Sequence, residues 1–451
     1  MSLKIFRKLL SIFICLMFIS STPPLLRADN SAPAQTNPVS PYPVDETPPL
    51  TFEDCYKLAL DESETVAIQK EAIARATAKI FTAASEALGD VDYVITREMQ
   101  EQQKQPVSGG SATSGGAIND PDISQQKFTI SQPLFQGFKA FGALKGAGSY
   151  KQEQKDAYRR AKELLYQDVA YAFYGVLRYQ KELGIIREIH GLLKKRIKEL
   201  EEREKIGRSR ASEVAQAVTR LKTLEADLAG VKGSLATTHY ILEYLIGMEI
   251  EGRKLQDNAS QDPSSRNLMD YLSLAGMRSD VKAAEQAVKT AKQGILIAQS
   301  GFWPTIYLDH TQYTRREGSL GNVDWDLLFT IDVPLFSGTA TVGQLKDSIS
   351  VLKQQNLYLS RAKRLAQMEI KQSYESWRFS REQHLALNAA VEAAQKNYSL
   401  QTEEYRRSLV NNLDVLAALE SLNNTQQSEN QSYYQMKKDE ARLKVAVGEV
   451  L

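Results

Sequence analysis

Long stretches of the chain carry apolar residues at alternating spacings of three and four, the pattern of a coiled-coil helix. The clearest run comprises Leu165, Val169, Ala172, Val176, Tyr179, Leu183, Ile186, His190, Leu193, Ile197 and Leu200. His190 is the polar member of this run, and we expect it to hydrogen-bond to a neighbouring helix. A helix over 139–206 would be about 100 Å long, which is too long for an ordinary compact domain.

Segments with a period of two interrupt the helical pattern. In 324–333 one face is apolar and the other mostly polar, which is typical of a half-buried strand. The apolar face comprises Trp325, Leu327, Phe329, Ile331 and Val333. The segment 126–132 repeats the pattern with Phe128 and Ile130. Alternation over 91–96 indicates another strand, and Ile306 and Leu308 lie in a fourth, of weaker alternation. The sequence thus predicts two strand pairs, over about 91–133 and about 304–334.

The chain repeats itself. Residues 128–145 and 329–346 are identical at ten of 18 positions at an offset of 201. Ordinary residue usage would give roughly one match. The offset persists through the helices that follow, as far as Gly247 and Gly448. Upstream it becomes 216, so the first copy has 15 extra residues between its strands, in the Gly- and Ser-rich segment 106–121.

The duplication gives the expected domain organisation. The first repeat spans 51–256, with a helix over 51–88, a strand pair and a helical hairpin over 139–247; the second spans 268–451, with its hairpin over 338–448. The stretch 257–267 joins the repeats, and the Pro-rich stretch 29–50 is expected to be an extended linker.

The first 28 residues have the pattern of a secretory signal peptide. A basic start with Lys4, Arg7 and Lys8 precedes an apolar run of eleven residues over 9–19. The alternative is a buried N-terminal helix. Removal of residues 1–28 would leave Cys55 as the single cysteine, so no intrachain disulfide could form.

The amino-acid composition excludes several classes of function. The 451 residues include 56 Lys+Arg and 55 Asp+Glu, a balance that excludes a strongly basic nucleic-acid binder. The 4 His and 2 Cys are too few for a Cys/His metal framework, so we expect no metal or cofactor. No apolar run reaches the roughly 18 residues that a membrane-spanning helix needs. Without such a helix, only a closed β-barrel can satisfy the backbone hydrogen bonds in lipid. Four strands are too few to close a barrel, so several copies of the chain would have to assemble.

Several motifs resemble the TolC-like family of outer-membrane efflux channels, from about residue 51 to the C-terminus. They are QPLFQG (132–137), VPLFSG (333–338), NNLDVLAA (411–418), TFEDCYKLAL (51–60) and LKVAVG (443–448). The resemblance implies a mainly α chain with a small β part. It implies a homotrimer whose four strands per chain complete a 12-stranded transmembrane β-barrel. The apolar strand residues named above would face the outer-membrane lipid. A long-helix α-barrel would continue across the periplasm to a constricted tip.

The resemblance also implies partners for the tip: a periplasmic adaptor (membrane fusion) protein and an inner-membrane transporter. The adaptor-docking triplets would be Ile206-Gly207-Arg208 and Ser408-Leu409-Val410. The first keeps the glycine of the family's Val-Gly-Leu-like turn but has arginine for leucine, and the second lacks the glycine. We expect Gly207, and Asn411 or Asn412, to end the preceding helices in the left-handed conformation.

Asp414 matches a position where the family's pore constriction can carry an aspartate, and Glu213 is its counterpart in the first repeat. In a trimer each position would become a ring of three carboxylates that attracts cations. Asn411 followed by Asp414 is also a helix-capping pattern, and the two roles are compatible.

Two other function classes remain as alternatives. A periplasmic structural or adaptor protein could also carry long helical hairpins, although two strand pairs without a compact β domain do not favour it. An enzyme is the third class. The sequence contains no GxSxG, HExxH or GxxxxGK[ST] motif, so we expect no catalytic residues.

Overall fold

The computed structural model describes residues 49–99, 122–250, 253–257, 266–317 and 321–450. The signal peptide, most of the linker 29–50, the segment 106–121 and most of the joining stretch 257–267 lie outside these residues.

The described chain contains the same series of elements twice. The first series is α2 (Phe52–Glu62), α3 (Glu64–Leu88), β2 (Asp90–Met99), β3 (Asp122–Gln136), α4 (Lys139–Lys205) and α5 (Ala211–Ile246). The second is α6 (Leu268–Ser273), the 3₁₀ helix η1 (Leu274–Met277), α7 (Ser279–Ser300), β5 (Thr305–Arg316), β6 (Trp325–Asp332), α8 (Ala340–Arg406) and α9 (Asn412–Val447). Helices α4 and α8 have 67 residues each, and α5 and α9 have 36 each, so the internal duplication is confirmed.

One expected helix is broken. The sequence predicted a single helix over 51–88, but the chain is extended at Ser63, with ψ 110°. Ser63 ends α2 and caps α3, because its Oγ accepts a hydrogen bond from the Val66 N–H at 3.4 Å. Thr51 and Asp54 form a capping box at the start of α2. A two-residue parallel pair, β1 (Leu50–Thr51) with β4 (Leu255–Gln256), lies next to this start.

Four strands form one antiparallel sheet in the order β2-β3-β5-β6. The middle contact joins the two repeats, because β3 of the first pairs with β5 of the second. Register shifts in this pairing occur at Gln126/Lys127 and Pro133/Phe135. Within the described residues, β2 and β6 each have a strand neighbour on one side only.

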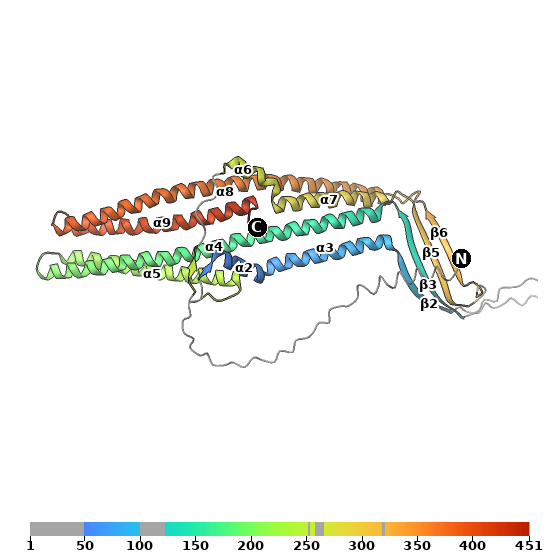
Figure 1. Cartoon of the computed structure of the whole chain (residues 1–451), viewed down its shortest axis with the longest axis horizontal. Coiled ribbons are helices and arrows are strands. Elements are labelled where there is room, and N and C mark those ends of the chain that lie inside the picture. The colour runs from blue at the N-terminus through green and yellow to red at the C-terminus, as the bar shows by residue number, and fades with distance from the viewer. Residues whose placement is uncertain (1–48, 100–121, 251–252, 258–265, 318–320, 451) are drawn as a thin grey trace, which may run out of the picture. The chain divides into compact units, whose positions relative to one another are not determined.

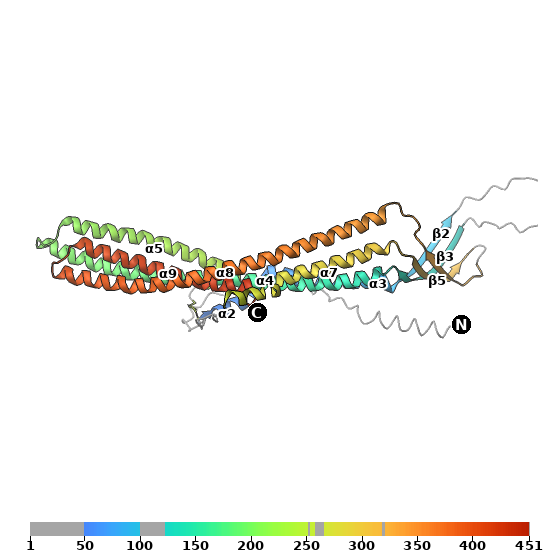
Figure 2. The ribbon, with the colours of Figure 1, turned by 90° about the horizontal axis from the view of Figure 1, so that it is seen from above.

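The long helices pack side by side. Helix α4 contacts α3, α5, α7 and α9, and α8 contacts α7 and α9 (Figure 1). Both hairpin turns lie at the end of the helices that is opposite the sheet, as Figures 1 and 2 show. The expected apolar run along α4 is confirmed: eight of its members are buried, namely Leu165, Val169, Ala172, Val176, Leu183, Ile186, Leu193 and Leu200. His190 Nε2 lies 3.5 Å from Glu225 Oε1 of α5, the contact to a neighbouring helix that its position predicted.

The buried apolar residues form three clusters along the helices. One joins α2, α4 and α5 around Phe173, a second lies near the hairpin turns around Leu200, and a third joins η1, α8 and α9 around Ile370. Cys55 is a free thiol and is fully buried in the first cluster. No helix among the described residues is both long enough and apolar enough to cross a membrane.

Candidate functional site

The first hairpin turn is a Schellman motif. The Arg208 N–H donates to the Arg203 carbonyl, and the Gly207 N–H donates to the Glu204 carbonyl, both at 2.8 Å. Gly207 has φ +72°, so the left-handed conformation expected of it is confirmed. The motif satisfies carbonyls that would otherwise lack a partner at the end of α4.

The second turn repeats this geometry without glycine. The Leu409 N–H donates to the Glu404 carbonyl and the Ser408 N–H donates to the Tyr405 carbonyl, both at 3.0 Å. Ser408 takes the left-handed conformation, with φ +63°. The expectation that Asn411 or Asn412 would do so is wrong, because Asn411 is extended and caps α9 while Asn412 is its first residue. Ser408 is therefore the structural counterpart of Gly207.

The predicted docking triplets differ in exposure. Ile206 is 67% exposed and Leu409 is 70% exposed, and Gly207, Arg208 and Ser408 are exposed as well. Val410 instead is partly buried against the apolar cluster near the turns. Since Ser408 matches Gly207, the triplet equivalent to Ile206-Gly207-Arg208 is Arg407-Ser408-Leu409, one residue before the predicted one.

The two carboxylates predicted for a constriction lie in the first turns of α5 and α9. Asp414 completes a capping box: its N–H donates to Asn411 Oδ1, and its Oδ2 accepts from the Asn411 N–H, both at 3.1 Å. The capping role is thus confirmed, and the Asp414 side chain remains exposed. Glu213 accepts a hydrogen bond of 2.6 Å from the Ser209 hydroxyl, and Arg210, which precedes α5, makes no side-chain cap.

A cation connects the two hairpins beside these turns. The Arg196 guanidinium of α4 donates to Asn412 Oδ1 at 2.9 Å and lies 3.7 Å from the centre of the Tyr405 ring. Arg203 approaches the same ring to 4.6 Å. Arg196 and Asn412 are buried, and Nη2 of Arg196 and Nδ2 of Asn412 have no hydrogen-bond partner in the described part of the chain. This cluster holds the two turns together as one tip.

The sheet has one mainly apolar face. The register aligns Tyr93 with Phe128, Val91 with Ile130, and Leu308 with Phe329, and directly opposed residues point to the same side. The predicted strand residues Phe128, Ile130, Trp325, Leu327, Phe329 and Ile331 all belong to this face. Val333 lies just beyond β6, which ends at Asp332. Tyr307 lies on the opposite face, where Ser131 donates a hydrogen bond to Asp309.

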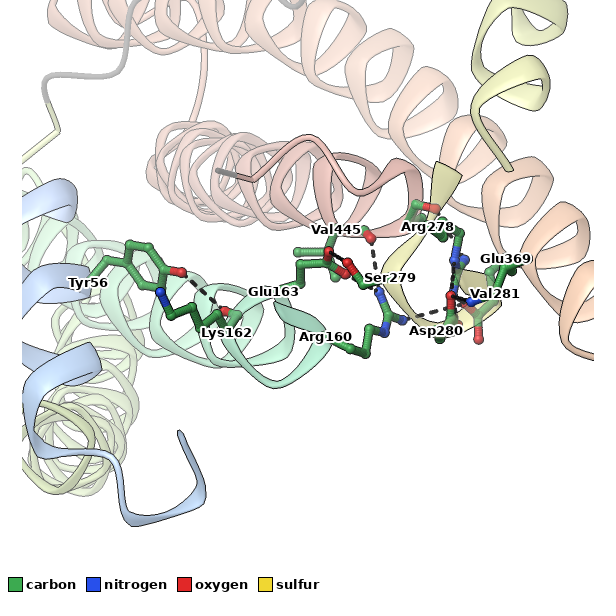
Figure 3. A network of polar contacts seen from close by, with 11 residues as sticks. Tyr56, Arg160, Lys162, Glu163, Arg278, Ser279, Asp280, Val281, Glu369 and Val445 are labelled. Carbon is green, nitrogen blue, oxygen red and sulfur yellow. Dashed lines mark hydrogen bonds and ion pairs between the residues drawn. The ribbon is translucent and has the colours of Figure 1, made fainter. Parts of the chain in front are cut away.

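A buried polar network joins the repeats midway along the helices (Figure 3). Arg278, whose side chain is 0% exposed, precedes α7. Its guanidinium binds Asp280 through two hydrogen bonds of 3.0 and 2.7 Å, Glu369 of α8 at 2.7 Å, and the Ala446 carbonyl of α9 at 3.1 Å. Burial alone would raise the pKa of Asp280, but the hydrogen bonds and charge of Arg278 outweigh it and lower that pKa.

The first repeat enters this network through α4. Arg160 donates to Glu163 at 3.0 Å and to the Val445 carbonyl at 3.2 Å, and the Ser279 hydroxyl donates to Glu163 at 2.6 Å (Figure 3). Two arginines therefore bind carbonyls in the last turn of α9, where the helix leaves most carbonyls without an intrahelical partner; the Val445 carbonyl also accepts from the Gly448 N–H at 3.3 Å. The network fixes α4 against three helices of the second repeat.

A family model described as outer membrane efflux protein matches residues 55–248 and 273–449. The chain belongs to the outer membrane efflux protein family. The two matched segments correspond to the two series of elements described above, and the family assigns this efflux protein to the outer membrane. The comparisons give no support to a periplasmic structural protein.

Individual relatives are distant in sequence. The efflux protein is 23% identical over 249 residues to outer membrane protein TolC of Vibrio cholerae, an alignment that covers 52% of this chain and 56% of that relative. The chain thus spans little more than half the length of this curated relative. The crystal structure of VceC from Vibrio cholerae matches with a TM-score of 0.77 at 20% identity, covering 88% of this chain and 96% of that one. The Campylobacter jejuni CmeC outer membrane channel matches with a TM-score of 0.75 at 15% identity, covering 92% and 94%.

The described residues of the efflux protein contain no group of three or more His, Cys, Asp or Glu side chains placed to hold a metal ion. Sequence reasoning missed both arginine-centred clusters, around Arg196 and Arg278. Neither arginine belongs to a motif or to the apolar run. Beside a local carboxylate, each binds partners more than 80 residues away along the chain, namely Asn412 for Arg196, and Glu369 and Ala446 for Arg278. Their distant partners Asn412 and Ala446 lie within the family-like segments 411–418 and 443–448, and these segments are the sequence signal that could have directed attention to the two clusters.

Proposed function

We propose that three copies of this efflux protein form a channel that carries substrates across the periplasm and outer membrane. The observation that carries the proposal is the four-stranded sheet with β2 and β6 at its edges. Unpaired edge groups are costly in lipid, and an antiparallel pairing of β6 with β2 of the next copy would satisfy them. Three copies would supply twelve strands, a size known for bacterial barrels.

The apolar face of the sheet would then contact lipid and the polar face would line the lumen. Phe128, Trp325, Leu327, Phe329 and Ile331 are all exposed in the single chain, as lipid-facing side chains would be. Trp303 and Trp325 lie toward opposite ends of the sheet, where aromatic residues favour the two membrane interfaces. Val333, just beyond β6, would lie at the edge of the apolar band.

The tip would be the periplasmic end of the channel. Asp414 and Glu213, near the two turns, would form rings of carboxylates in a trimer and constrict the pore. The exposed turn residues would meet a periplasmic adaptor protein, which connects the channel to an inner-membrane transporter. Similarity to VceC and CmeC supports the fold of such a channel.

The test is the conductance of the purified protein in planar lipid bilayers, combined with its oligomeric state in detergent. We expect a trimer in the outer-membrane fraction that shifts on gels when heated and conducts ions. A protein found in the soluble periplasmic fraction, or a monomer that conducts as well as any larger species, would contradict the proposal.

A further inference from the structure

Each of the two tip turns exposes one apolar side chain and one arginine, which lie on either side of the residue in the left-handed conformation. In the first turn Ile206 precedes the left-handed residue and Arg208 follows it. In the second, Arg407 precedes the left-handed residue and Leu409 follows it. The order of apolar and cationic residues is thus reversed between the repeats. We refer to Ile206, Arg208, Arg407 and Leu409 as the tip surface.

The apolar members of this surface are largely exposed, and neither belongs to a buried apolar cluster of the described residues. In a Schellman motif the residue after the left-handed position often packs on an apolar residue one turn back. Leu409 occupies that position, but the residues one turn back are Glu403 and Glu404, and Leu409 stays 70% exposed. Ile206 is similarly exposed at the equivalent end of α4.

The cations of the surface are also available. Arg208 has no ion pair within the described residues, and its backbone alone takes part in the turn. Arg407 lies 3.0 Å from Glu403, but its side chain is 68% exposed, so this pair is weak and can exchange. Lys205, Arg210 and Arg406 are neighbours of the tip surface in the sequence. No acidic residue occurs in 205–210 or 405–410, and Glu204, Glu403 and Glu404 lie just before these segments.

The two turns form one surface because the cluster around Arg196 ties them together. Arg196 and Arg203 of α4 both lie against Tyr405 of α8, and Arg196 also binds Asn412 of α9. Each turn thus presents an arginine beside an exposed aliphatic side chain. Arginine pairs with carboxylates and aliphatic side chains pack on apolar ones, so the two turns fit a partner surface in which carboxylates alternate with apolar side chains.

We propose that the tip surface selects a protein partner whose contacting loops carry Asp or Glu next to apolar residues. The inference rests on the proposed function, since it names the chemistry of the partner that meets the channel tip. Because the turns order their residues oppositely, the partner contacts the first and second turns with different arrangements of acid and apolar groups. Basic or uncharged loops would leave Arg208 without a counter-charge.

The test uses the full chain in the cells that produce it, with a photoreactive benzoylphenylalanine in place of Ala211. Ala211 is exposed, starts α5 and lies outside the tip surface. Illumination should cross-link a periplasmic protein through a peptide containing Asp or Glu beside an apolar residue. The double variant Arg208→Glu with Arg407→Glu should lower the cross-linking yield at least tenfold. Lys70→Glu, an exposed change on α3, should leave the yield unchanged.

Charge rescue completes the test. Replacing the cross-linked acids of the partner by Lys should restore cross-linking to the double variant and weaken it with the original chain. A cross-linked peptide without acids, or a yield that the double variant leaves unchanged, overturns the inference. If the bilayer conductance is normal but no cross-link forms, the inference about the partner is overturned, whereas the proposed channel function stands. Absence of conductance in the unaltered protein would instead count against the proposed function.

Discussion

Removal of the Arg278 guanidinium should destabilise the region where the repeats meet. Arg278→Met keeps much of the side-chain length but removes four hydrogen bonds, two to Asp280, one to Glu369 and one to the Ala446 carbonyl. Breaking a buried ion pair costs about 3–5 kcal/mol, because the remaining charges lose their compensation. The carboxylate side chains are 29% and 31% exposed, so water can partly solvate them, and we expect about 3 kcal/mol, at the lower end.

Backbone hydrogen exchange of the assembled protein in detergent measures this effect locally. Protection of the last turn of α9, where Ala446 lies, should fall by about 100-fold, since each 1.4 kcal/mol corresponds to roughly a factor of ten. Arg278→Lys should recover only part of the loss, because an ammonium group cannot bind carboxylates in a two-pronged fashion. The control is Arg378→Met on α8, whose side chain is 46% exposed and pairs with Glu375 on the surface.

The control should change protection by less than a factor of about two to three, as expected of an exposed pair worth below roughly 0.5 kcal/mol. If Arg278→Met leaves the last turn of α9 as protected as the control does, the buried network contributes no net stability. The reasoning would also be refuted if protection fell equally along α4 and α9, because the loss would then be global.

Four further outcomes follow from the structure. Ser408→Gly should raise the free energy of unfolding by about 0.5–1 kcal/mol, because glycine takes the left-handed conformation without strain, and Gly207→Ala should lower it by a similar amount in urea titrations. Asp414→Asn keeps a side-chain oxygen that can accept the hydrogen bond from the Asn411 N–H, but it removes the negative charge. A drop in the cation preference of the channel in bilayers, with unchanged thermal stability, would identify a role of Asp414 in the pore. An unchanged ion selectivity would leave helix capping as its only role. Burial raises the pKa of the Cys55 thiol to about 11, so at neutral pH thiol reagents should label it only after unfolding, and rapid labelling of the native protein would disprove its burial. The folded-state pKa of Asp280 is lowered, so its contribution to stability is present above its ordinary pKa of about 4 and is lost as the pH falls below it; Asp280→Asn should therefore flatten the acid side of the stability curve.

The helical hairpins were predictable from the sequence because local patterns specify them. The spacing of Leu165 to Leu200 defines one buried side of a helix whatever packs against it. The capping box of Asn411 and Asp414 involves residues three apart, so it also follows from local sequence. The strands were predictable for the same reason, since alternation decides which residues share a face before any partner strand is known.

The ends of helices were harder to predict from the sequence where the preferences of neighbouring residues compete. Ser63 interrupts the expected helix 51–88 because its hydroxyl caps α3 more favourably than it fits a continuous helix. The left-handed residue of the second turn was assigned to asparagine on preference, yet the hydrogen bonds of the turn require that conformation at Ser408. Equivalence with Gly207 in the repeat was the stronger guide.

By itself the sequence determined the two repeats, which show as identical residues at a constant offset of 201. It also determined the long hairpins, the faces of the strands and the cap formed by Asn411 and Asp414, because these depend on neighbours within about one helical turn or one strand. Only the tertiary structure decided that β3 pairs with β5, that Arg196 links the two turns, and that Arg278 and Arg160 hold the end of α9. These contacts join residues far apart in the chain. Their energy depends on burial and on the meeting of opposite charges, which no local pattern of residues records.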